Sequence, residues 1–427
     1  MEFYKETKFK KTDISEIPEN WEFTRLGEIL ALIRNGLTKK QDRGRRKYPV
    51  TRIETISEEQ IDVNKIGFVE NVTQEEIKNY SLIDGDILFS HINSLEHIGK
   101  TAIYQGNPPL LLHGMNLLLL RAIKSKINPW FLLYLLKLLR LKLFFSNIAK
   151  KAVNQASINQ TELGRVKVPF PPRIEEQRKI TSILSTVDEA IQKTNEIIQK
   201  TQELKKGMMQ QLLTKGIGHK KFKQTEIGEI PEEWEVVRLE EVANRFISGG
   251  TPATSKPEYW NGNIHWMRSA SIRNRAVNSG EKYITKEGLN NSATNIVPKG
   301  NILVATRVSI GKVAINTIDI AISQDLTGVV LNTNKAIPEY VYWTLSKAES
   351  KIKSFIQGST IRGVLRKDLE NLKIPLPSSL EQQKIVSILS DVDEKIEKEK
   401  QTKEQLEKLK KGLMQILLTG KLRVKAD

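Results

Sequence analysis

The sequence predicts an α/β protein made of two copies of one unit, each an α/β domain followed by a long helix. Two internal repeats support this prediction. Residues 9–22 return in closely similar form as residues 222–235, and residues 182–185 return as residues 387–390. Both steps are near 200 residues, far longer than the about 20–50 residues of a solenoid repeat, so a whole domain with its helix is duplicated.

Composition limits the class of protein. A chain of 427 residues is too long for one hydrophobic core and suits two or three domains. It has no cysteine, which excludes disulfides and thiolate chemistry. The N-terminus lacks the apolar stretch of a secretory signal, and the apolar residues 130–145 are too short and too charged to span a membrane. We therefore expect a cytoplasmic protein with no membrane contact.

The chain is strongly basic. It carries 67 Lys and Arg against 50 Asp and Glu, a formal net charge of +17. A basic surface gains affinity for nucleic acid by releasing phosphate counterions, although a lysine-rich background composition would produce the same excess. The charge alone leaves both explanations open.

Matched segments predict the same topology in the two domains. Residues 84–90 indicate a turn and a buried strand, and residues 299–305 occupy the same place in the second half. Pro129 and Pro338 each open an apolar stretch, where proline is well tolerated at the first helical position. We expect domains at 1–168 and 217–374, each with its lead-in, separated by a spacer helix at 169–216 and followed by a second spacer helix with the C-terminal tail at 375–427.

Two helices of roughly 40 residues, about 60 Å each, carry apolar residues at steps of three and four. A stripe of that length needs a partner of similar length, so we expect the two helices to pair as an antiparallel coiled coil with pseudo-twofold symmetry. The alternative is that each helix packs separately on another subunit. The residues assigned to the coiled coil or to partner docking are Ile180, Leu184, Val187, Ile191, Ile198, Leu204, Ile385, Leu389, Val392, Ile396, Leu406 and Leu409.

The motifs of catalysis are missing. Five scattered histidines lack zinc-site spacing, and residues 99–101 imitate only the end of a phosphate-binding loop. Residues 107–110 resemble the Asn-Pro-Pro-aromatic motif of amino-group DNA methyltransferases, but Leu110 cannot stack on a base. We predict no catalytic residue, no metal site and no cofactor bound by this chain.

Polar loops at matched places differ between the two halves, while the surrounding framework repeats. Arginine reads guanine and Asn or Gln reads adenine in the major groove, so divergent polar loops suit two domains that read two different sequences. An ordinary solvated turn is the alternative for each loop. The candidate DNA-binding residues of the first half are Lys39, Lys40, Arg43, Arg45, Arg46, His91, Asn93, Asn154, Gln155 and Ser157. Those of the second half are Thr251, Thr254, Lys256, Arg268, Ser271, Arg273, Arg275, Arg307, Ser359 and Arg362.

The proline-rich exits and the helices that follow them resemble a known family. Residues 174–180 and 380–385, with residues 205–214 and their copy at 410–419, are similar to the spacer helices of type I restriction–modification specificity subunits. The lead-in at 229–235 resembles the same family. Two departures concern the exits: Arg173 lengthens the first, and Ser378 and Ser379 replace a proline in the second.

This resemblance implies two target-recognition domains, each reading one half of a split, asymmetric site on double-stranded DNA. It implies spacer helices that set the gap and dock modification subunits, two in number, which bring S-adenosylmethionine. Restriction and translocase subunits would join with ATP and Mg²⁺, and this subunit would itself catalyse nothing. The competing hypothesis from the residues is a helical scaffold with a non-specific basic surface.

Overall fold

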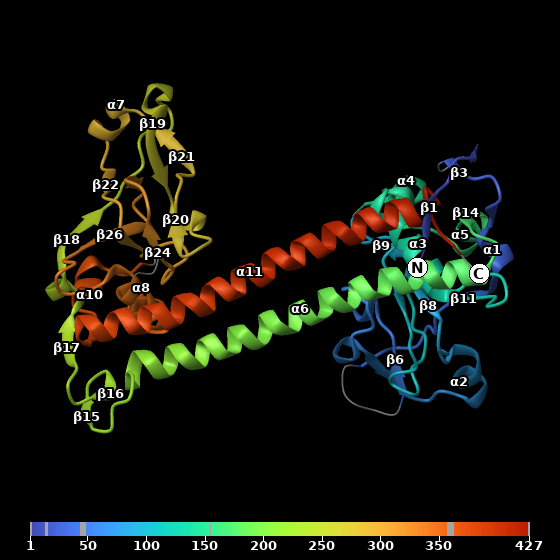
Figure 1. The fold of residues 1–427 in the computed structure, drawn as a ribbon, viewed down its shortest axis with the longest axis horizontal. Coiled ribbons are helices and arrows are strands. Elements are labelled where there is room, and N and C mark those ends of the chain that lie inside the picture. Colours follow the sequence, from blue (N-terminus) through green and yellow to red (C-terminus); the bar gives the residue numbers. More distant parts are fainter. Residues whose placement is uncertain (1, 13–15, 43–47, 154, 357–362, 426–427) are drawn as a thin grey trace. The chain divides into compact units, whose positions relative to one another are not determined.

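The computed structural model describes residues 2–12, 16–42, 48–153, 155–356 and 363–425. The chain forms two compact units. Unit 1 contains Met1–Asn195 and Gln401–Asp427, and unit 2 contains Glu196–Lys400. Each unit combines one α/β domain with one end of each long helix (Figure 1).

Unit 1 is a mixed α/β domain with short strands. Its strands are β1 Phe3–Lys5, β2 Phe9–Lys11, β3 Glu16–Pro18, β4 Glu22–Arg25, β5 Leu30–Asn35, β6 Tyr48–Val50, β7 Gly67–Val69, β8 Ile87–Ser90, β9 Ile92–Asn93, β10 Thr101–Ile103, β11 Leu117–Ala122, β12 Lys150–Ala152, β13 Gln155–Ser157, β14 Lys167–Phe170 and β28 Leu422–Val424. Its shorter helices are α1 Leu26–Ile29, η1 Ile53–Ile56, η2 Val63–Lys65, α2 Gln74–Tyr80, α3 Pro129–Leu141, α4 Phe144–Ile148 and α5 Gln160–Arg165.

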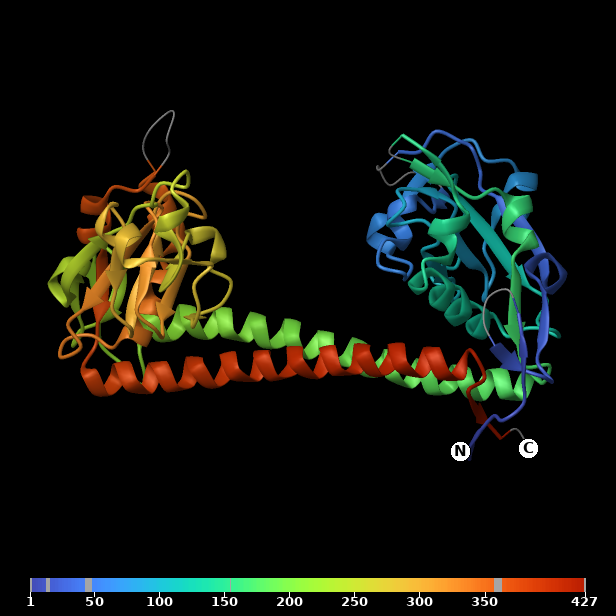
Figure 2. The same cartoon turned by 90° about the horizontal axis from the view of Figure 1, so that it is seen from above.

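An antiparallel sheet in the order β10-β8-β11-β5 forms the centre of unit 1. Every residue of β8 is buried, because α3 packs on one face of the sheet and a second apolar cluster covers the other. The helix α3 begins at Pro129, as predicted, and the Asn128 side chain caps it. The termini meet nearby, where β1 pairs with β28 (Figure 2).

Unit 2 repeats this plan with a larger sheet. Its strands are β15 Phe222–Thr225, β16 Gly228–Pro231, β17 Glu235–Arg238, β18 Ala243–Ser248, β19 Trp260–Met267, β20 Ala276–Val277, β21 Lys282–Ile284, β22 Asn295–Val297, β23 Asn301–Ala305, β24 Val313–Asn316, β25 Ile320–Ile322, β26 Leu326–Leu331 and β27 Lys373–Leu376. Its shorter helices are η3 Leu239–Val242, η4 Pro257–Tyr259, η5 Ser269–Ser271, α7 Lys286–Asn290, α8 Pro338–Lys347, α9 Glu349–Ser354 and α10 Arg366–Glu370.

The main sheet of unit 2 has the order β18-β26-β23-β24-β20, and a second sheet has the order β21-β19-β25-β22. Strand β23 falls within residues 299–305, where the sequence predicts a strand, and α8 begins at Pro338. The predicted α/β class with matched frames in the two halves is therefore confirmed. What differs is the extra sheet, which contains β19 and the segments around it.

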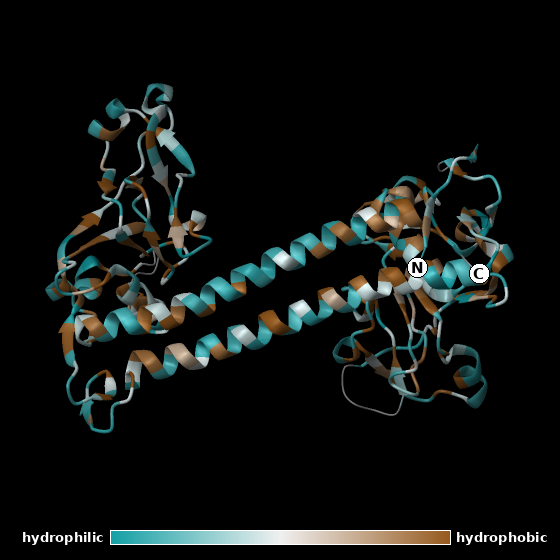
Figure 3. Cartoon of the chain, viewed as in Figure 1, coloured by the Kyte–Doolittle hydropathy of each residue, from teal (hydrophilic) through white to brown (hydrophobic). Residues whose placement is uncertain are grey.

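The two long helices are α6 Ile174–Lys215 and α11 Ser379–Leu417, of 42 and 39 residues. They run antiparallel within each unit. In unit 1 Lys410 lies 2.5 Å from Asp188, and in unit 2 Lys205 lies 2.5 Å from Asp393. Hydrophobic residues recur along both helices between hydrophilic ones (Figure 3). Across the described part of the chain, no helix is both long enough and apolar enough to cross a membrane.

We call the row of positions at steps of three and four along each long helix its seam. The seam of α6 differs from the predicted row of residues at Leu204. This side chain is 58% exposed, whereas Thr194 and Thr201 are buried. Steps of four and three from Ile180 lead through Ile191, Thr194, Ile198 and Thr201 to Lys205, so Leu204 lies one position outside the heptad seam.

The seam of α11 differs from the predicted row of residues in the same way, at Leu409. Leu409 is 51% exposed, while the seam passes through Leu406 and Lys410. Among the other assigned positions, Ile180, Leu184, Ile385, Leu389 and Ile396 are buried. The partly buried ones are Val187, Ile191, Ile198, Val392 and Leu406.

A buried glutamine joins each long helix to its own domain. In unit 1 the Gln177 side chain accepts from the Asn128 backbone N–H at 2.7 Å and donates to the Lys126 and Pro171 carbonyls. In unit 2 Gln382 accepts from the Ile337 N–H at 2.9 Å and donates to the carbonyls of Lys335 and Pro377. These bonds satisfy backbone groups at the starts of α3 and α8 that would otherwise be buried without partners.

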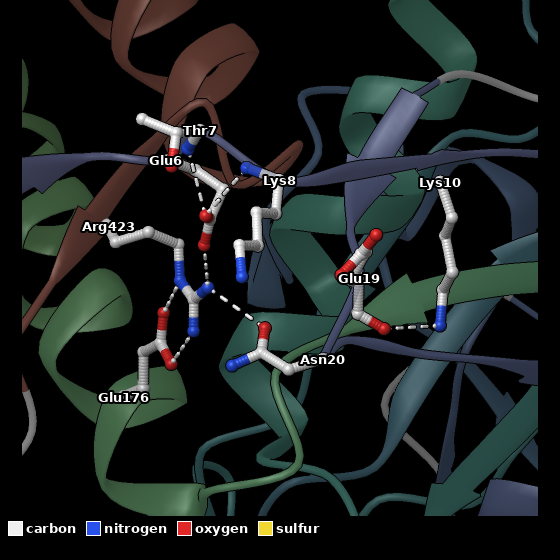
Figure 4. Close-up of polar contacts among 8 residues, drawn as sticks. All are labelled: Glu6, Thr7, Lys8, Lys10, Glu19, Asn20, Glu176 and Arg423. Carbon is white, nitrogen blue, oxygen red and sulfur yellow. Dashed lines mark hydrogen bonds and ion pairs between the residues drawn. The ribbon is translucent and has the colours of Figure 1, made fainter.

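A carboxylate beside each glutamine, buried at Glu176 and partly buried at Glu381, ties the lead-in to the helix. In unit 1 Glu176 accepts two bonds from Arg423, at 2.6 and 2.9 Å, and Arg423 also contacts Glu6 at 2.7 Å (Figure 4). In unit 2 Glu381 accepts from the indole N–H of Trp234 and lies 2.8 Å from the His219 ring. The same carboxylate position therefore bonds the segment that follows α11 in unit 1 and the segment that follows α6 in unit 2.

Replacing Gln177 by Ala should lower the free energy of unfolding of unit 1 by about 2–3 kcal/mol, because buried backbone groups lose their partners. Hydrogen exchange of the α3 amides measures the loss. Gln382→Ala should have the same effect on the α8 amides of unit 2. Gln401→Ala, on an exposed helical face, is the control and should change stability by less than about 0.5 kcal/mol. Equal exchange in all three variants would contradict the role given to the glutamines.

Candidate nucleic-acid interface

Three predicted polar loops of unit 2 meet at one turn, which follows β25. Thr251 donates to the Gln324 side chain at 2.6 Å, and the Asp325 carboxylate accepts from the Ser269 N–H at 3.1 Å. The Thr306 N–H donates to the Asp325 carbonyl at 2.9 Å. Asp325 is buried. The turn at Gln324 and Asp325 therefore connects the three loops, through the Gln324 side chain, the Asp325 carboxylate and the Asp325 carbonyl.

The loop at η5 is braced by Glu281, which the sequence prediction did not include. Arg268 Nε donates to Glu281 at 3.2 Å and the Ser271 hydroxyl donates to it at 2.6 Å. The Arg268 guanidinium, helped by Ser271, holds the pKa of Glu281 at about 2. Both predicted DNA-contacting side chains are therefore pre-oriented by one ionised carboxylate.

The segment after β23 lies against the same loop. The Ser269 hydroxyl donates to the Val308 carbonyl at 2.7 Å, and the Val364 N–H donates to the Thr306 carbonyl at 2.8 Å. Arg307 is exposed and Val308 is 55% exposed. Ser359 and Arg362, predicted for the neighbouring segment, lie outside the described residues.

The remaining candidates of unit 2 are spread more widely. Thr254 and Arg273 are exposed. The Lys256 ammonium lies over the Tyr259 ring, 4.9 Å from its centroid. Arg275 donates to the Ser390 hydroxyl of α11 at 2.9 Å, so the structure places it at the long helix, away from the turn at Asp325.

In unit 1, two segments far apart in the sequence become neighbours. Strands β12, β13 and β9 form one small sheet, in which Ser157 pairs with Ile92, and Asn93 lies opposite Ala156. Asn93 and Ser157 are partly exposed and Gln155 is exposed. The structure therefore brings these three candidates together, while Asn154 lies outside the described residues.

The side chain of His91 is buried and does not lie at the surface with the other candidate residues. It is only 7% exposed, and burial lowers the pKa of its ring to about 4, so the imidazole is neutral near pH 7. Its carbonyl accepts from the Ile158 N–H at 2.9 Å, which joins the two predicted segments. The described hydrogen bond of His91 therefore connects two segments of the domain.

The basic loop after β5 is only partly described. Lys39 lies 2.6 Å from Glu76, whose side chain accepts from the N–H of Thr73 at the N-cap of α2, and Lys40 is exposed. Arg43, Arg45 and Arg46 lie outside the described residues. The loop begins at Gly36, where the backbone passes close to that of Gly114. A Cβ added at Gly36 would fall 1.8 Å from the Gly114 carbonyl oxygen.

Gly249 occupies the same place in unit 2. An added Cβ there would lie 2.2 Å from the Ser323 carbonyl oxygen. A glycine is needed at both positions because the two backbones meet there without room for a side chain. The two divergent loops therefore leave the shared frame at the same point.

Sequence reasoning missed four further residues. Glu281, Gln324 and Asp325 organise the loops of unit 2, but no local pattern distinguishes them from other surface polar residues. Val153 directly follows β12 and is 92% exposed. An apolar residue beside Lys150 and Lys151 at the end of a strand is the one signal that the sequence offered.

The described residues contain no group of histidine and acidic side chains able to hold a metal ion. The polar residues gathered in the two units are donors and acceptors of hydrogen bonds, with arginine and lysine beside them. Such a set can contact bases and phosphates.

Comparison with known proteins identifies the family. The model of the type I restriction modification DNA specificity domain matches twice, at residues 18–203 and 231–408. The chain is 47% identical over 427 residues to the putative type I restriction enzyme MjaX specificity subunit of Methanocaldococcus jannaschii, covering 100% of this chain and 99% of that protein. It is 30% identical to the MjaVIII specificity subunit of the same organism, covering 100% and 98%.

A solved structure has the same fold. The S subunit of a type I restriction-modification system from M. genitalium superposes with a TM-score of 0.59 at 16% identity, covering 96% of this chain and 99% of that one. The chain belongs to the family of type I restriction–modification specificity subunits, as the spacer-helix resemblance predicted. As a member it is a non-catalytic subunit.

The brace at η5 makes a prediction about pH. Because Arg268 stabilises the charged form of Glu281, the stabilisation is fully present above the ordinary pKa of 4.5 and is lost as the pH falls through about 2. Carboxyl chemical shifts in NMR should show Glu281 titrating near pH 2. Arg268→Gln should move the midpoint toward 4.5, and Ser271→Ala should move it less. An unchanged midpoint in Arg268→Gln would show that the ion pair does not form.

Proposed function

We propose that each domain of this specificity subunit reads one half of a bipartite, asymmetric site on double-stranded DNA. The observation that carries the proposal is the pair of divergent polar loop sets on one repeated frame. Gly36 and Gly249 start the first loops at equivalent points. The polar residues gathered beyond the shared frame differ: Asn93, Gln155 and Ser157 in unit 1, and Arg268, Ser271 and Arg307 in unit 2. Different donors on the same frame suit different base sequences.

The long helices set the distance between the half-sites in this proposal. They are the segments that join one domain to the other along the chain, and helix length converts directly into distance at 1.5 Å per residue. A helical pair with a buried seam is stiff enough to act as a spacer.

The same helices dock the modification subunits. Leu204 in unit 2 and Leu409 in unit 1 occupy equivalent positions in the repeat, and both are more than half exposed. An exposed leucine at the same place in each copy supports two similar docking surfaces, hence two modification subunits. Those subunits supply S-adenosylmethionine, restriction and translocase subunits supply the ATP- and Mg²⁺-dependent functions, and the complex works in the cytoplasm.

Exchange of one domain tests the reading function. Residues 20–168 are replaced by the corresponding domain of another specificity subunit, and the chain is assembled with its modification subunits. Mapping of the methylated bases should show one half-site changed and the other retained. A scaffold would show no change in DNA preference. A continuous methylated site in the parent complex would contradict the two-domain reading.

Lengthening the helices tests the spacer. Seven residues are inserted after Lys200 in α6 and after Glu397 in α11, positions that lie opposite each other by the register of Lys205 with Asp393. The insertion keeps the heptad and adds about 10 Å, or about three base pairs, to the gap between half-sites. Methylation mapping measures the gap.

A two-residue insertion at the same points is the control. It rotates the helix by about 200°, which turns the seam away from its partner and should abolish assembly. A seven-residue variant that assembles and methylates with the original gap would refute the spacer role.

A further inference from the structure

Unit 2 contains a basic hollow that is separate from the turn where the polar loops meet. It encloses about 680 Å³ between the segment after η5 and helices α8 and α9. Three cationic side chains line it: Arg273, Arg275 and Lys312. Glu349 is the one carboxylate among the described lining residues.

Two backbone contacts position the segments that carry these cations. The Ile315 N–H of β24 donates to the Arg275 carbonyl at 2.8 Å, which anchors the segment to the main sheet. Gly311 has a φ of +87°, and an added Cβ would lie 2.7 Å from Glu349 Cγ. That close approach, which glycine permits, places Lys312 beside α9.

The contacts of the cations do not cancel their charge. Arg275 donates to the Ser390 hydroxyl at 2.9 Å and its guanidinium lies 5.6 Å from the Trp343 ring centroid. Lys312 reaches the Ile272 carbonyl at 3.4 Å. These partners are neutral, and Glu349 is itself paired with Lys353 at 2.6 Å. The hollow is therefore positively charged.

The corresponding part of unit 1 does not have this excess of positive charge. Lys100 takes the place of Lys312 and donates to the Ser57 carbonyl at 2.7 Å, so the two segments correspond. Two residues further on, Glu59 stands where unit 2 has Asn274, and it pairs with Arg140 and Lys137. Asp188 and Glu189 line the hollow beside it. The basic hollow is thus a property of unit 2 and not of the repeated frame.

We propose that this hollow binds a phosphate of the DNA backbone. The inference rests on the proposed function, because the phosphate belongs to the duplex that the domains read. Arg275 is held in place by Ser390 and Trp343, and Arg273 and Lys312 are exposed beside it. Guanidinium and ammonium groups around an open hollow match a phosphate, which carries charge and no sequence information.

The contact with the phosphate adds affinity for DNA but no sequence specificity. It is made by unit 2 and has no counterpart in unit 1. Each phosphate neutralised by a cation contributes about 0.9 to the slope of log K against log salt concentration. Specificity and salt dependence therefore come from different places in the domain, the first from the loops at Asp325 and the second from the hollow.

The test uses the complete complex with its modification subunits. Binding to a duplex that carries the methylated motif, and to an unrelated duplex, is measured at several salt concentrations. Arg273→Gln with Lys312→Gln removes the contact to one phosphate, so it should reduce the slope by about 1 and weaken both complexes by a similar factor. The methylated motif should stay the same.

The control removes the same charge elsewhere. Lys299→Gln with Lys335→Gln changes two exposed lysines of unit 2 outside the hollow and should leave the slope unchanged. A wild-type slope in the hollow variant would overturn the inference and leave the proposed function standing. Weaker binding of the modification subunits with an unchanged slope would also overturn it, because the occupant would then be a protein. Failure of the wild-type complex to bind the duplex would instead remove the proposed function.

Discussion

The rest of the structure depends on burial of the apolar seam along α6 and α11. A helix of about 40 residues with a continuous stripe is unstable in water unless that stripe meets another apolar surface. At each end the seam enters the core of an α/β domain, with Ile180 and Leu184 in unit 1 and Ile385 and Leu389 in unit 2. In unit 1 the helix pair and the domain share one core, and in unit 2 the helix pair forms a cluster with α8 and the lead-in strand β16.

Polar side chains fix that packing in position. Gln177 and Gln382 satisfy the backbone at the helix starts of α3 and α8, and Glu176 and Glu381 hold the chain that follows the helix pair. These contacts lie in the frame and not in the divergent polar loops, so the loops differ between the two units while the frame repeats.

Much of this arrangement could be predicted from the sequence, because it follows from local rules. Proline at the first helical position, the heptad spacing and the duplicated strands each depend on near neighbours in the chain. Leu204 shows the limit of that reasoning: an apolar residue beside the buried stripe cannot be told from one inside it without the partner helix. The interaction of Arg268 with Glu281 was equally out of reach, since it depends on how β19 and β21 bring two loops together.

The sequence by itself determined the duplicated frame, the long helices and the family, because these depend on spacing and on repeated motifs. The tertiary structure alone decided which polar residues meet. Gln324 and Asp325 together bond three loops, Ser157 pairs with Ile92 across one small sheet, and Arg275 bonds Ser390 of α11. Such contacts depend on distances between residues far apart in the chain, which only the folded backbone specifies.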